Sequence, residues 1–308
     1  MPVHVIDSLF FRDLYGSAAM RAVFDDLNLL QKWLDYEAAL ARAEATLGLV
    51  PTDAAAEITR QAKAEYMDIG AIKHGVDETV HPLVALIWQL SDRCAGSAGR
   101  YVHWGATTQD VMDTALILQI KEAYPLFEAG LSLLIEAATR LARRYRNTLM
   151  AGRTHGQQAL PITFGFKAAV WVAELKRHQE RLQACKPRVL VGEFGGAVGT
   201  LASVGADGLD IQAKLMQELG LNLPQIAWHT ARDHLAEFTS LLSMITTTLG
   251  KIAHEIILLQ KSEVGEVEEP FEHGKVGSST MPQKRNPMLC ESILTLARLT
   301  RVQTLSAL

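Results

Sequence analysis

The chain has 308 residues, of which 48% are hydrophobic and 21% charged, enough to bury a large core and to form more than one domain. A net charge of −4 without a basic block excludes bulk attraction to a polyanion, so nucleic acid is not an expected partner. The three cysteines form neither an even disulfide set nor a paired metal spacing, which is typical of a reducing compartment. No apolar run approaches membrane-spanning length and no targeting pattern opens the chain, so we expect a cytoplasmic protein without a membrane segment.

The predicted elements are helices along almost the whole chain. Residues 18 to about 89 are expected to form shorter helices, separated at Gly48, Pro51 and Gly70. Alternating strand patterns are nearly absent. The first third of the chain is therefore predicted to be a set of short, packed helices.

Three longer helices follow. The first is expected over 110–146, with a kink or break near Pro125, and the second over 163–186, where Pro187 should end it. The third is expected over 232–263, because apolar residues recur there at steps of three and four. Long helices with irregular connections predict an all-α fold built around a helical bundle.

Polar residues cluster in four predicted breaks between these helices. The breaks are GVDETVHP at 75–82, YVHWGATTQD at 101–110, AGRTHGQQALP at 151–161 and GSSTMPQKRNP at 277–287. Hydroxyl groups and free backbone N–H groups before a helix bind anions well. Several such helix ends, if they converge, would form a carboxylate-binding site.

Each of these features also has a simpler interpretation. Thr107, Thr108 and Asp110 could be capping residues of the following helix. His81 could be a surface turn residue, and His155 a hydrogen-bonded loop histidine.

Two further patterns are not expected to be sites. The glycine-rich run VGEFGGAVGT at 191–200 lacks the Lys-Ser/Thr end of a phosphate loop and is predicted to be a tight connector. His178 and His254 lie within predicted helices and are given no role. The histidines lack the paired spacing of a zinc site, so no metal is expected.

The loop at 277–287 is harder to explain as structure alone. Its glycine and two serines supply flexibility and hydroxyl groups, and such a loop could close over a substrate and exclude water. A serine that acts as a base needs surroundings that stabilise its alkoxide, and Lys284 and Asn286 offer a cation and an amide donor. The same groups would hold a carboxylate, which points to proton abstraction at the carbon beside it.

The loop sequence GSSTMPQKRNP resembles the signature of the fumarase/aspartase superfamily. ATTQD, GRTHGQQ and WHTARD at 228–233 match further segments of that superfamily in the same order. The resemblance implies a helical N-terminal domain over 1–109, a central long-helix bundle over 110–308 and a small C-terminal domain. We expect that last domain to be missing and the bundle to be incomplete, because the chain stops within an expected helix. The family assembles as homotetramers whose active sites draw on three subunits.

The resemblance also implies roles for individual residues. Ser278 corresponds to the general base, with Ser279 as a less favoured substitute. Lys284 and Asn286 would bind the substrate carboxylate and stabilise the intermediate. His155 corresponds to the general acid of the branch that contains adenylosuccinate lyase.

Other positions would bind substrate. His81 matches the region of a second active-site histidine, and Arg232 would contact a carboxylate from a neighbouring subunit. The remaining substrate-binding positions are Thr107, Thr108, Gln109 and Thr154.

The implied reaction is a reversible β-elimination from a succinyl-type dicarboxylate, with C–N cleavage and release of a fumarate-type product. No cofactor is needed, because the carboxylate of the substrate is the electron sink. Several segments look most like 3-carboxy-cis,cis-muconate cycloisomerase, so lactonisation of a tricarboxylate is the alternative. A retained His155 favours elimination, because a leaving amine must be protonated. A catalytically inactive scaffold is the third possibility.

Overall fold

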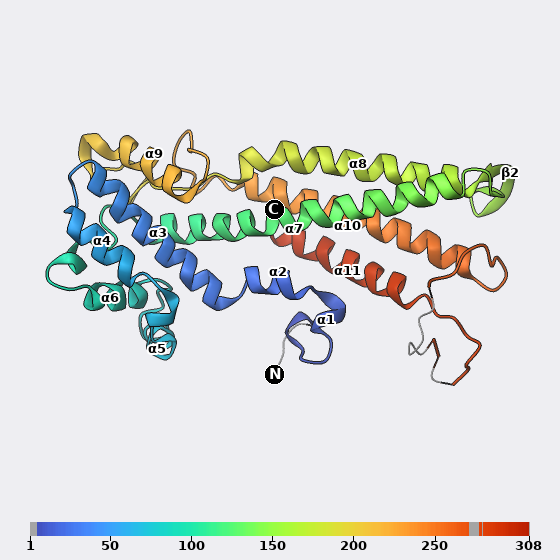
Figure 1. The fold of residues 1–308 in the computed structure, drawn as a ribbon, viewed down its shortest axis with the longest axis horizontal. Coiled ribbons are helices and arrows are strands. Elements are labelled where there is room, and N and C mark those ends of the chain that lie inside the picture. The colour runs from blue at the N-terminus through green and yellow to red at the C-terminus, as the bar shows by residue number, and fades with distance from the viewer. Residues whose placement is uncertain (1–4, 271–276, 279, 308) are drawn as a thin grey trace. The chain divides into compact units, whose positions relative to one another are not determined.

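The computed structural model describes residues 5–270, 277–278 and 280–307. Within these ranges the prediction of an all-α fold is confirmed, with a single two-stranded hairpin as the exception (Figure 1). Contacts divide the chain into two compact units, which we call unit 1 (residues 1–17, 127–185 and 233–308) and unit 2 (residues 18–126 and 186–232). The domain boundary expected at 109/110 stays a prediction.

Unit 2 holds the short helices expected near the N-terminus. Its longest complete helix, α3, begins after Asp25, whose carboxylate accepts the N–H of Leu27 at 2.9 Å as an N-cap. Fully buried Leu34, Leu40 and Ile58 form part of the core between α3 and α4. The elements are α2 (Ala18–Val23), α3 (Asp26–Thr46), α4 (Thr52–Gln61), α5 (Ile69–Thr79), α6 (Val84–Arg93), the start of α7 (Thr108–Arg144), α9 (Gly208–Leu219) and the 3-10 helices Ala64–Tyr66, Ala98–Tyr101 and Gly205–Asp207.

Unit 1 contains the long helices of the bundle. Helices α10 and α11 pack along each other, and Leu131, Ala138 and Leu175 form a buried cluster between the later part of α7 and α8. The elements are α1 (Arg12–Tyr15), the rest of α7, β1 (Leu149–Thr154), β2 (Gln157–Thr163), most of α8 (Phe164–Val189), α10 (Asp233–Gln260), α11 (Met288–Thr304) and the 3-10 helices Val5–Asp7 and Leu305–Ala307.

The hairpin of β1 and β2 replaces the simple break expected at 151–161. The strands pair antiparallel from Leu149↔Thr163 to Thr154↔Gln157. His155 and Gly156 form the two-residue turn, with φ values of 54° and 73°. Positive φ at both central positions is typical of a type I′ turn, whose twist matches that of the strands. The hairpin was not predicted from the sequence, because histidine occupies the turn position where asparagine or aspartate is usual.

The helix ends also differ from the expectations in three places. Helix α7 runs through Pro125 without a break, so only the kink expected there stays a prediction, and α8 continues two residues past Pro187 to Val189. Pro187 lacks the N–H that would bond to the carbonyl of residue 183, but only two residues of the helix follow it. Residues 75–79 belong to α5 rather than to a break, so only the end of that predicted loop is irregular.

Helix α10 differs from the expectation that no membrane-length apolar run exists. It is the one helix of the described chain that is long and apolar enough to cross a membrane by length and composition. It packs along α11 and buries Phe238, Leu241 and Ala253. Core helices of bundles have the same composition, so this property alone is weak evidence for a membrane segment.

A buried polar relay joins α8 to α10 within unit 1. The hydroxyl of Thr248 donates to Glu174 Oε1 at 2.8 Å and lies 2.8 Å from Nε2 of His178. Because that hydroxyl gives its only hydrogen to Glu174, Nε2 of His178 must be the donor to Thr248. Burial lowers the pKa of His178, in agreement with a neutral ring. Lys251 completes the relay by donating to Glu174.

We expect Thr248→Val to lower the free energy of unfolding by about 1–3 kcal/mol, because it leaves buried His178 and half-buried Glu174 without their shared partner. Urea denaturation measures this change. Thr239→Val on the same helix is the matched control, because among the described residues the Thr239 hydroxyl bonds to no group but the carbonyls of Leu235 and Ala236 in its own helix. Equal effects of the two substitutions would show that the relay does not stabilise the unit.

Candidate active site

The threonine segment at the start of α7 lies against His81 in unit 2. Nδ1 of His81 accepts the backbone N–H of Val84 at 3.3 Å, so its hydrogen is on Nε2, which lies 3.2 Å from Oγ1 of Thr108. The structure therefore brings together two residues predicted to bind substrate, and His81 is not simply a surface turn residue. Thr107 precedes α7, and half-buried Gln109 lies in the first turn.

Asp110 takes part in the capping that the simpler interpretation suggested. Its Oδ2 accepts the backbone N–H of Thr107 at 3.0 Å, as the third residue of a helix does in a capping box. It also accepts the N–H groups of Gly195 and Gly196 and contacts Nε2 of His229 at 2.7 Å. The connector at 191–200 and the WHTARD segment thus meet the threonine segment at one carboxylate.

His103 and Glu37 form a pair that the sequence analysis missed. Nδ1 of His103 lies 2.7 Å from Oε1 of Glu37, whose side chain is fully buried. Burial lowers the pKa of His103, but the adjacent carboxylate outweighs this effect and the pKa is raised overall. The φ of 62° at His103 is a strained conformation of the kind that clusters at functional sites. The only signal in the sequence was a glutamate within the otherwise apolar run YEAALA.

Arg232, predicted to contact a carboxylate from another subunit, already has a partner in unit 2. Its guanidinium lies 2.6 Å from Oδ1 of buried Asp113 and stacks over the ring of Trp228 at 5.5 Å. A cation in this position is partly neutralised and held in one orientation.

One group of side chains has the proximity of a metal site. The ligand atoms of Asp110, Glu193 and His229 all lie within 4.8 Å of one another. A carboxylate offers about four acceptor positions, and Asp110 already accepts from three backbone N–H groups and His229. Burial raises the pKa of Glu193 to about 7, and the N–H of Trp228 opposes this shift. The geometry is that of a histidine held between two buried carboxylates, with no acceptor on Asp110 left for a metal.

The loop before α11 places the predicted base in unit 1. The Oγ of half-buried Ser278 accepts the backbone N–H groups of Met281 at 3.2 Å and Thr280 at 3.4 Å. Two backbone donors at one hydroxyl oxygen would stabilise negative charge on that oxygen. Ser279 lies outside the described residues.

The carboxylate-binding candidates follow in the same loop. Lys284 is exposed, and its backbone N–H bonds to the carbonyl of Met281 at 3.0 Å. Asn286 is half-buried, and its carbonyl accepts the N–H of Met288 at 2.9 Å. Neither side chain has a hydrogen-bond partner within the part of the chain that the structure describes, so an amide and an ammonium group remain available for a ligand.

Two residues that sequence reasoning missed fix the ends of this loop. Gln260 donates to the carbonyl of Arg285 at 3.1 Å and accepts the N–H of Glu269 at 3.0 Å. The carboxylate of Glu269 accepts the N–H groups of Cys290 at 2.7 Å and Leu289 at 3.2 Å, and so caps α11. These contacts join residues 9 to 25 positions apart, which no local pattern reveals.

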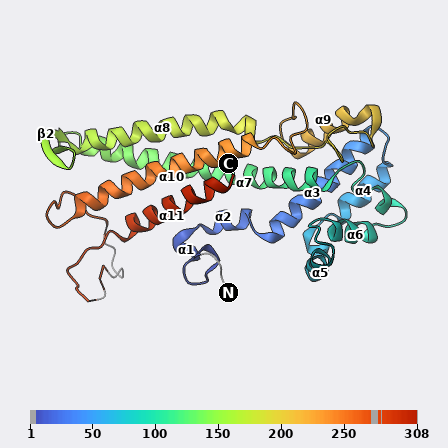
Figure 2. The ribbon, with the colours of Figure 1, turned by 180° about the vertical axis from the view of Figure 1, so that it is seen from behind.

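Thr154 and His155 lie exposed at the hairpin turn. Arg153 ties the hairpin to the segment after α10 through a bidentate pair with Glu266, at 2.7 and 2.9 Å. The hairpin and the loop before α11 lie at the same end of α8 and α10 in both views (Figures 1 and 2). Among the described residues, no hydrogen bond joins Ser278 to His155.

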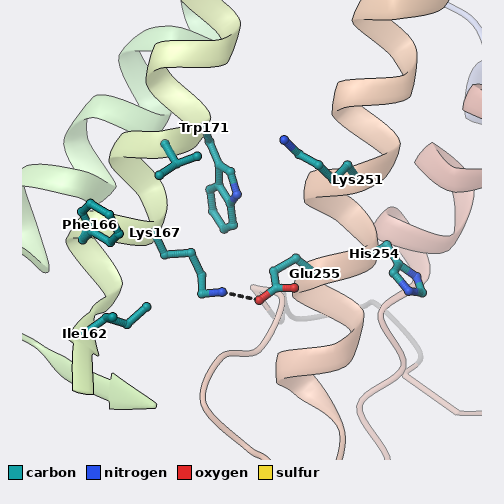
Figure 3. Close-up of a pocket in the computed structure, with 8 residues that line it drawn as sticks. Ile162, Phe166, Lys167, Trp171, Lys251, His254 and Glu255 are labelled. Atoms are coloured by element: carbon teal, nitrogen blue, oxygen red, sulfur yellow. Dashed lines mark hydrogen bonds and ion pairs between the residues drawn. The ribbon is translucent and has the colours of Figure 1, made fainter. Parts of the chain in front are cut away.

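A pocket of about 320 Å³ lies between α8 and α10 near the hairpin (Figure 3). Lys167 and Glu255 reach toward each other across it and form an ion pair of 2.5 Å. None of the predicted site residues lines it. The lining residues are Ile162, Phe166, Lys167, Val170, Trp171, Lys251, His254 and Glu255.

The fold is a set of long helices whose loops present hydroxyl, amide, imidazole and ammonium groups, which are side chains of the types that acid–base catalysis uses. The family model described as lyase matches residues 16–303, and the chain belongs to this lyase family, within the fumarase/aspartase superfamily.

Individual relatives share this similarity over nearly the whole chain. This chain is 46% identical to N-acetyl-S-(2-succino)cysteine lyase of Enterococcus italicus, and the match covers 96% of this chain and 65% of the relative. The chain is also 42% identical to adenylosuccinate lyase of Methanothermobacter thermautotrophicus, and that match covers 100% of this chain and 68% of the relative. The crystal structure of 3-carboxy-cis,cis-muconate lactonizing enzyme from Pseudomonas putida matches with a TM-score of 0.90 and 40% identity, over 96% of this chain and 66% of that one. The chain thus spans about 65% of the length of the curated relatives it matches.

Proposed function

We propose that this protein catalyses reversible β-elimination from a succinyl-type dicarboxylate and releases a fumarate-type product. Two of the relatives are named for such substrates, an N-acetyl-S-(2-succino)cysteine and an adenylosuccinate. Both names contain a succinyl group, while the remainder differs. The succinyl half is therefore the part of the substrate that the proposal specifies most firmly.

The observation that carries the proposal is the hydrogen bonding of Ser278. An ordinary serine is a weak base, because its alkoxide is unstable in water. The two backbone N–H groups that point at its Oγ would stabilise the alkoxide, and they are already oriented for this before the reaction begins. The exposed ammonium group of Lys284 follows in the same loop and adds positive charge.

The reaction would proceed in two steps. Ser278 removes a proton from the carbon beside one carboxylate, and that carboxylate takes up the negative charge with Lys284 and Asn286 as partners. His155 then donates a proton to the departing atom, and the electron pair left on carbon forms the alkene. Thr107, Thr108 and Thr154, with Gln109, His81 and Arg232, are the proposed carboxylate-binding residues. The substrate itself is the electron sink, so no cofactor enters the scheme.

A second candidate is cycloisomerisation of 3-carboxymuconate, and the structural match to the lactonizing enzyme favours it. The same base and acid would then act in the interconversion of 3-carboxymuconate and its lactone. Retention of His155 favours elimination, because protonation of a leaving amine requires an acid.

We also propose a homotetramer in the cytoplasm. Several large apolar side chains of unit 1 are exposed. Scattered apolar residues on a surface need no explanation, but a larger exposed apolar surface marks a site of interaction. A partner subunit would cover them. The exposed side chains include Leu133, Leu160, Phe166, Val170 and Met244.

An absorbance screen at the alkene band tests the function. The substrates are adenylosuccinate, argininosuccinate, N-succinyl amines, S-(2-succino)cysteine derivatives and 3-carboxymuconate. Fumarate released from a succinyl substrate would support the proposal, and lactone formation would favour the second candidate. An assembled protein that turns over none of them would be a scaffold, and the proposal would be wrong.

We expect His155→Gln to lower kcat by about 100-fold or more on substrates with an amine leaving group, because a positioned acid contributes this much. The loss should be smaller on a thiol leaving group, which departs without full protonation. Initial rates on a matched pair of N-succinyl and S-succinyl substrates measure the difference. Unchanged activity on the nitrogen substrate would contradict the role of His155.

A further inference from the structure

Asp110 has more hydrogen-bond donors around it than a helix cap requires. Its Oδ2 accepts the N–H groups of Thr107 and Gly196, each at 3.0 Å, and its Oδ1 accepts the N–H of Gly195 at 2.9 Å and lies 2.7 Å from Nε2 of His229. The side chain is fully buried. A cap would need the first of these contacts alone, so the other three call for a separate explanation.

The donors come from three segments that are far apart in the sequence. Two of these donors are backbone N–H groups of glycines at positions where a side chain would fit tightly. A Cβ on Gly195 would lie 3.0 Å from Cε1 of His229, and one on Gly196, whose φ is 70°, would lie 3.0 Å from the carbonyl oxygen of Gly105. The lack of side chains at these two positions therefore favours the close approach of the connector at 191–200 to the threonine segment.

Two carboxylates are buried in this cluster, and they lower the stability of the fold unless hydrogen-bond donors compensate them. Glu193 is fully buried beside Asp110, and its Oε1 accepts the N–H of Trp228 and lies 3.6 Å from Nε2 of His229. Removing two carboxylates from water is unfavourable, and apolar residues of the same size would often be at least as stable. His229 is the basic side chain that contacts both carboxylates.

We propose that Asp110 is a positioning residue that holds the backbone of Thr107, and with it the carboxylate-binding segment Thr107–Thr108, in place against the glycine connector, with Nε2 of His229 as a further hydrogen-bond donor. This inference rests on the proposed function, because Thr107 and Thr108 must bind substrate for their placement to matter. Asp110 itself would not touch the substrate. Its loss should therefore change substrate affinity and leave the chemical step largely intact.

The test is Asp110→Asn, which keeps the shape and turns one acceptor oxygen into an NH₂ group that faces backbone N–H donors. We expect KM to rise about 10- to 100-fold, the equivalent of one lost charged hydrogen bond, with kcat changed less than about threefold. The dissociation constant of succinate, measured by calorimetry, should rise by the same factor. Glu44→Gln is the matched control, because it makes the same carboxyl-to-amide change at another buried site of unit 2 that does not contact Thr107, and it should leave KM unchanged.

A purely structural role would give a different pattern. It would lower the melting temperature of Asp110→Asn while the folded fraction kept the wild-type KM and succinate affinity, and this result would overturn the proposal. If Asp110→Asn does not fold, His229→Phe removes the side-chain donor toward Asp110 and keeps a ring at this position, and a KM and succinate affinity equal to those of the wild type would then refute it. Wild-type protein that neither binds nor turns over any succinyl compound would refute the proposed function and this inference together, whereas normal wild-type turnover with unaffected variants would refute this inference alone.

Discussion

Replacing Ser278 by alanine is expected to lower kcat on the best succinyl substrate by about 100- to 10,000-fold, the range that a positioned base contributes. The substitution removes the oxygen that accepts the N–H groups of Thr280 and Met281, while both donors remain. Affinity for succinate should change little, because Lys284 and Asn286 still supply the carboxylate partners. Stopped-flow absorbance at the alkene band measures the loss.

Thr280→Ala provides the control for this experiment. It removes a hydroxyl group two residues further along the same loop and keeps the backbone N–H that points at Ser278. We expect nearly wild-type kcat from it. If Ser278→Ala turned over its substrate at the wild-type rate, Ser278 would not be the base, and Ser279 would be the next residue to replace.

The long helices were predictable because their signal is local and repeated. Apolar residues at steps of three and four defined α10 within three residues at each end, Asp233–Gln260 against the expected 232–263. The end of α8 was predicted three residues too early at Pro187, because Val189 is fully buried and its packing outweighs the low helix propensity of the proline. The hairpin at 149–163 was missed because its turn residues, histidine and glycine, form an uncommon pair for this geometry.

The site residues were predictable only where they form a recognisable motif in the sequence. The loop with Ser278 and the threonine segment were found from their composition. The partners that hold these segments were not, because the contacts of Glu269 with α11, of Glu37 with His103 and of Glu193 with Trp228 join residues 20 to 66 positions apart. A buried glutamate gives a weak signal in a single sequence, since its neighbours in space are not its neighbours in the chain.

These buried carboxylates have a cost in stability that can be measured at one of them. Glu44 on α3 is fully buried, and neither of its carboxyl oxygens has a hydrogen-bond partner within the described ranges. Desolvation, together with the charge of Glu37, raises its pKa from 4.5 to about 8. The folded state therefore keeps this proton at neutral pH, where the unfolded chain has released it.

Replacing Glu44 by glutamine is expected to stabilise the protein at alkaline pH. Because the folded-state pKa lies above the unfolded one, the stability from Glu44 is complete below about pH 4.5, declines from there to pH 8 and is lost above it. An interval of about 3.5 pH units corresponds to about 5 kcal/mol as an upper value. Glu44→Gln lacks this loss, so its advantage over the wild type should be near zero at pH 4.5 and largest above pH 8, as measured by urea denaturation across this range.

Glu57→Gln gives a control of opposite sign in the same unit. The N–H of Ala95 and the side chains of Gln61 and Arg60 bind the Glu57 carboxylate and lower its pKa to about 2, so its ionised form stabilises the fold above pH 4.5. Glu57→Gln should therefore be less stable than the wild type at pH 8, where Glu44→Gln is more stable. If both variants lost stability there, the Glu44 carboxylate would have to be ionised and favourably paired in the folded protein, and the explanation from desolvation would be wrong.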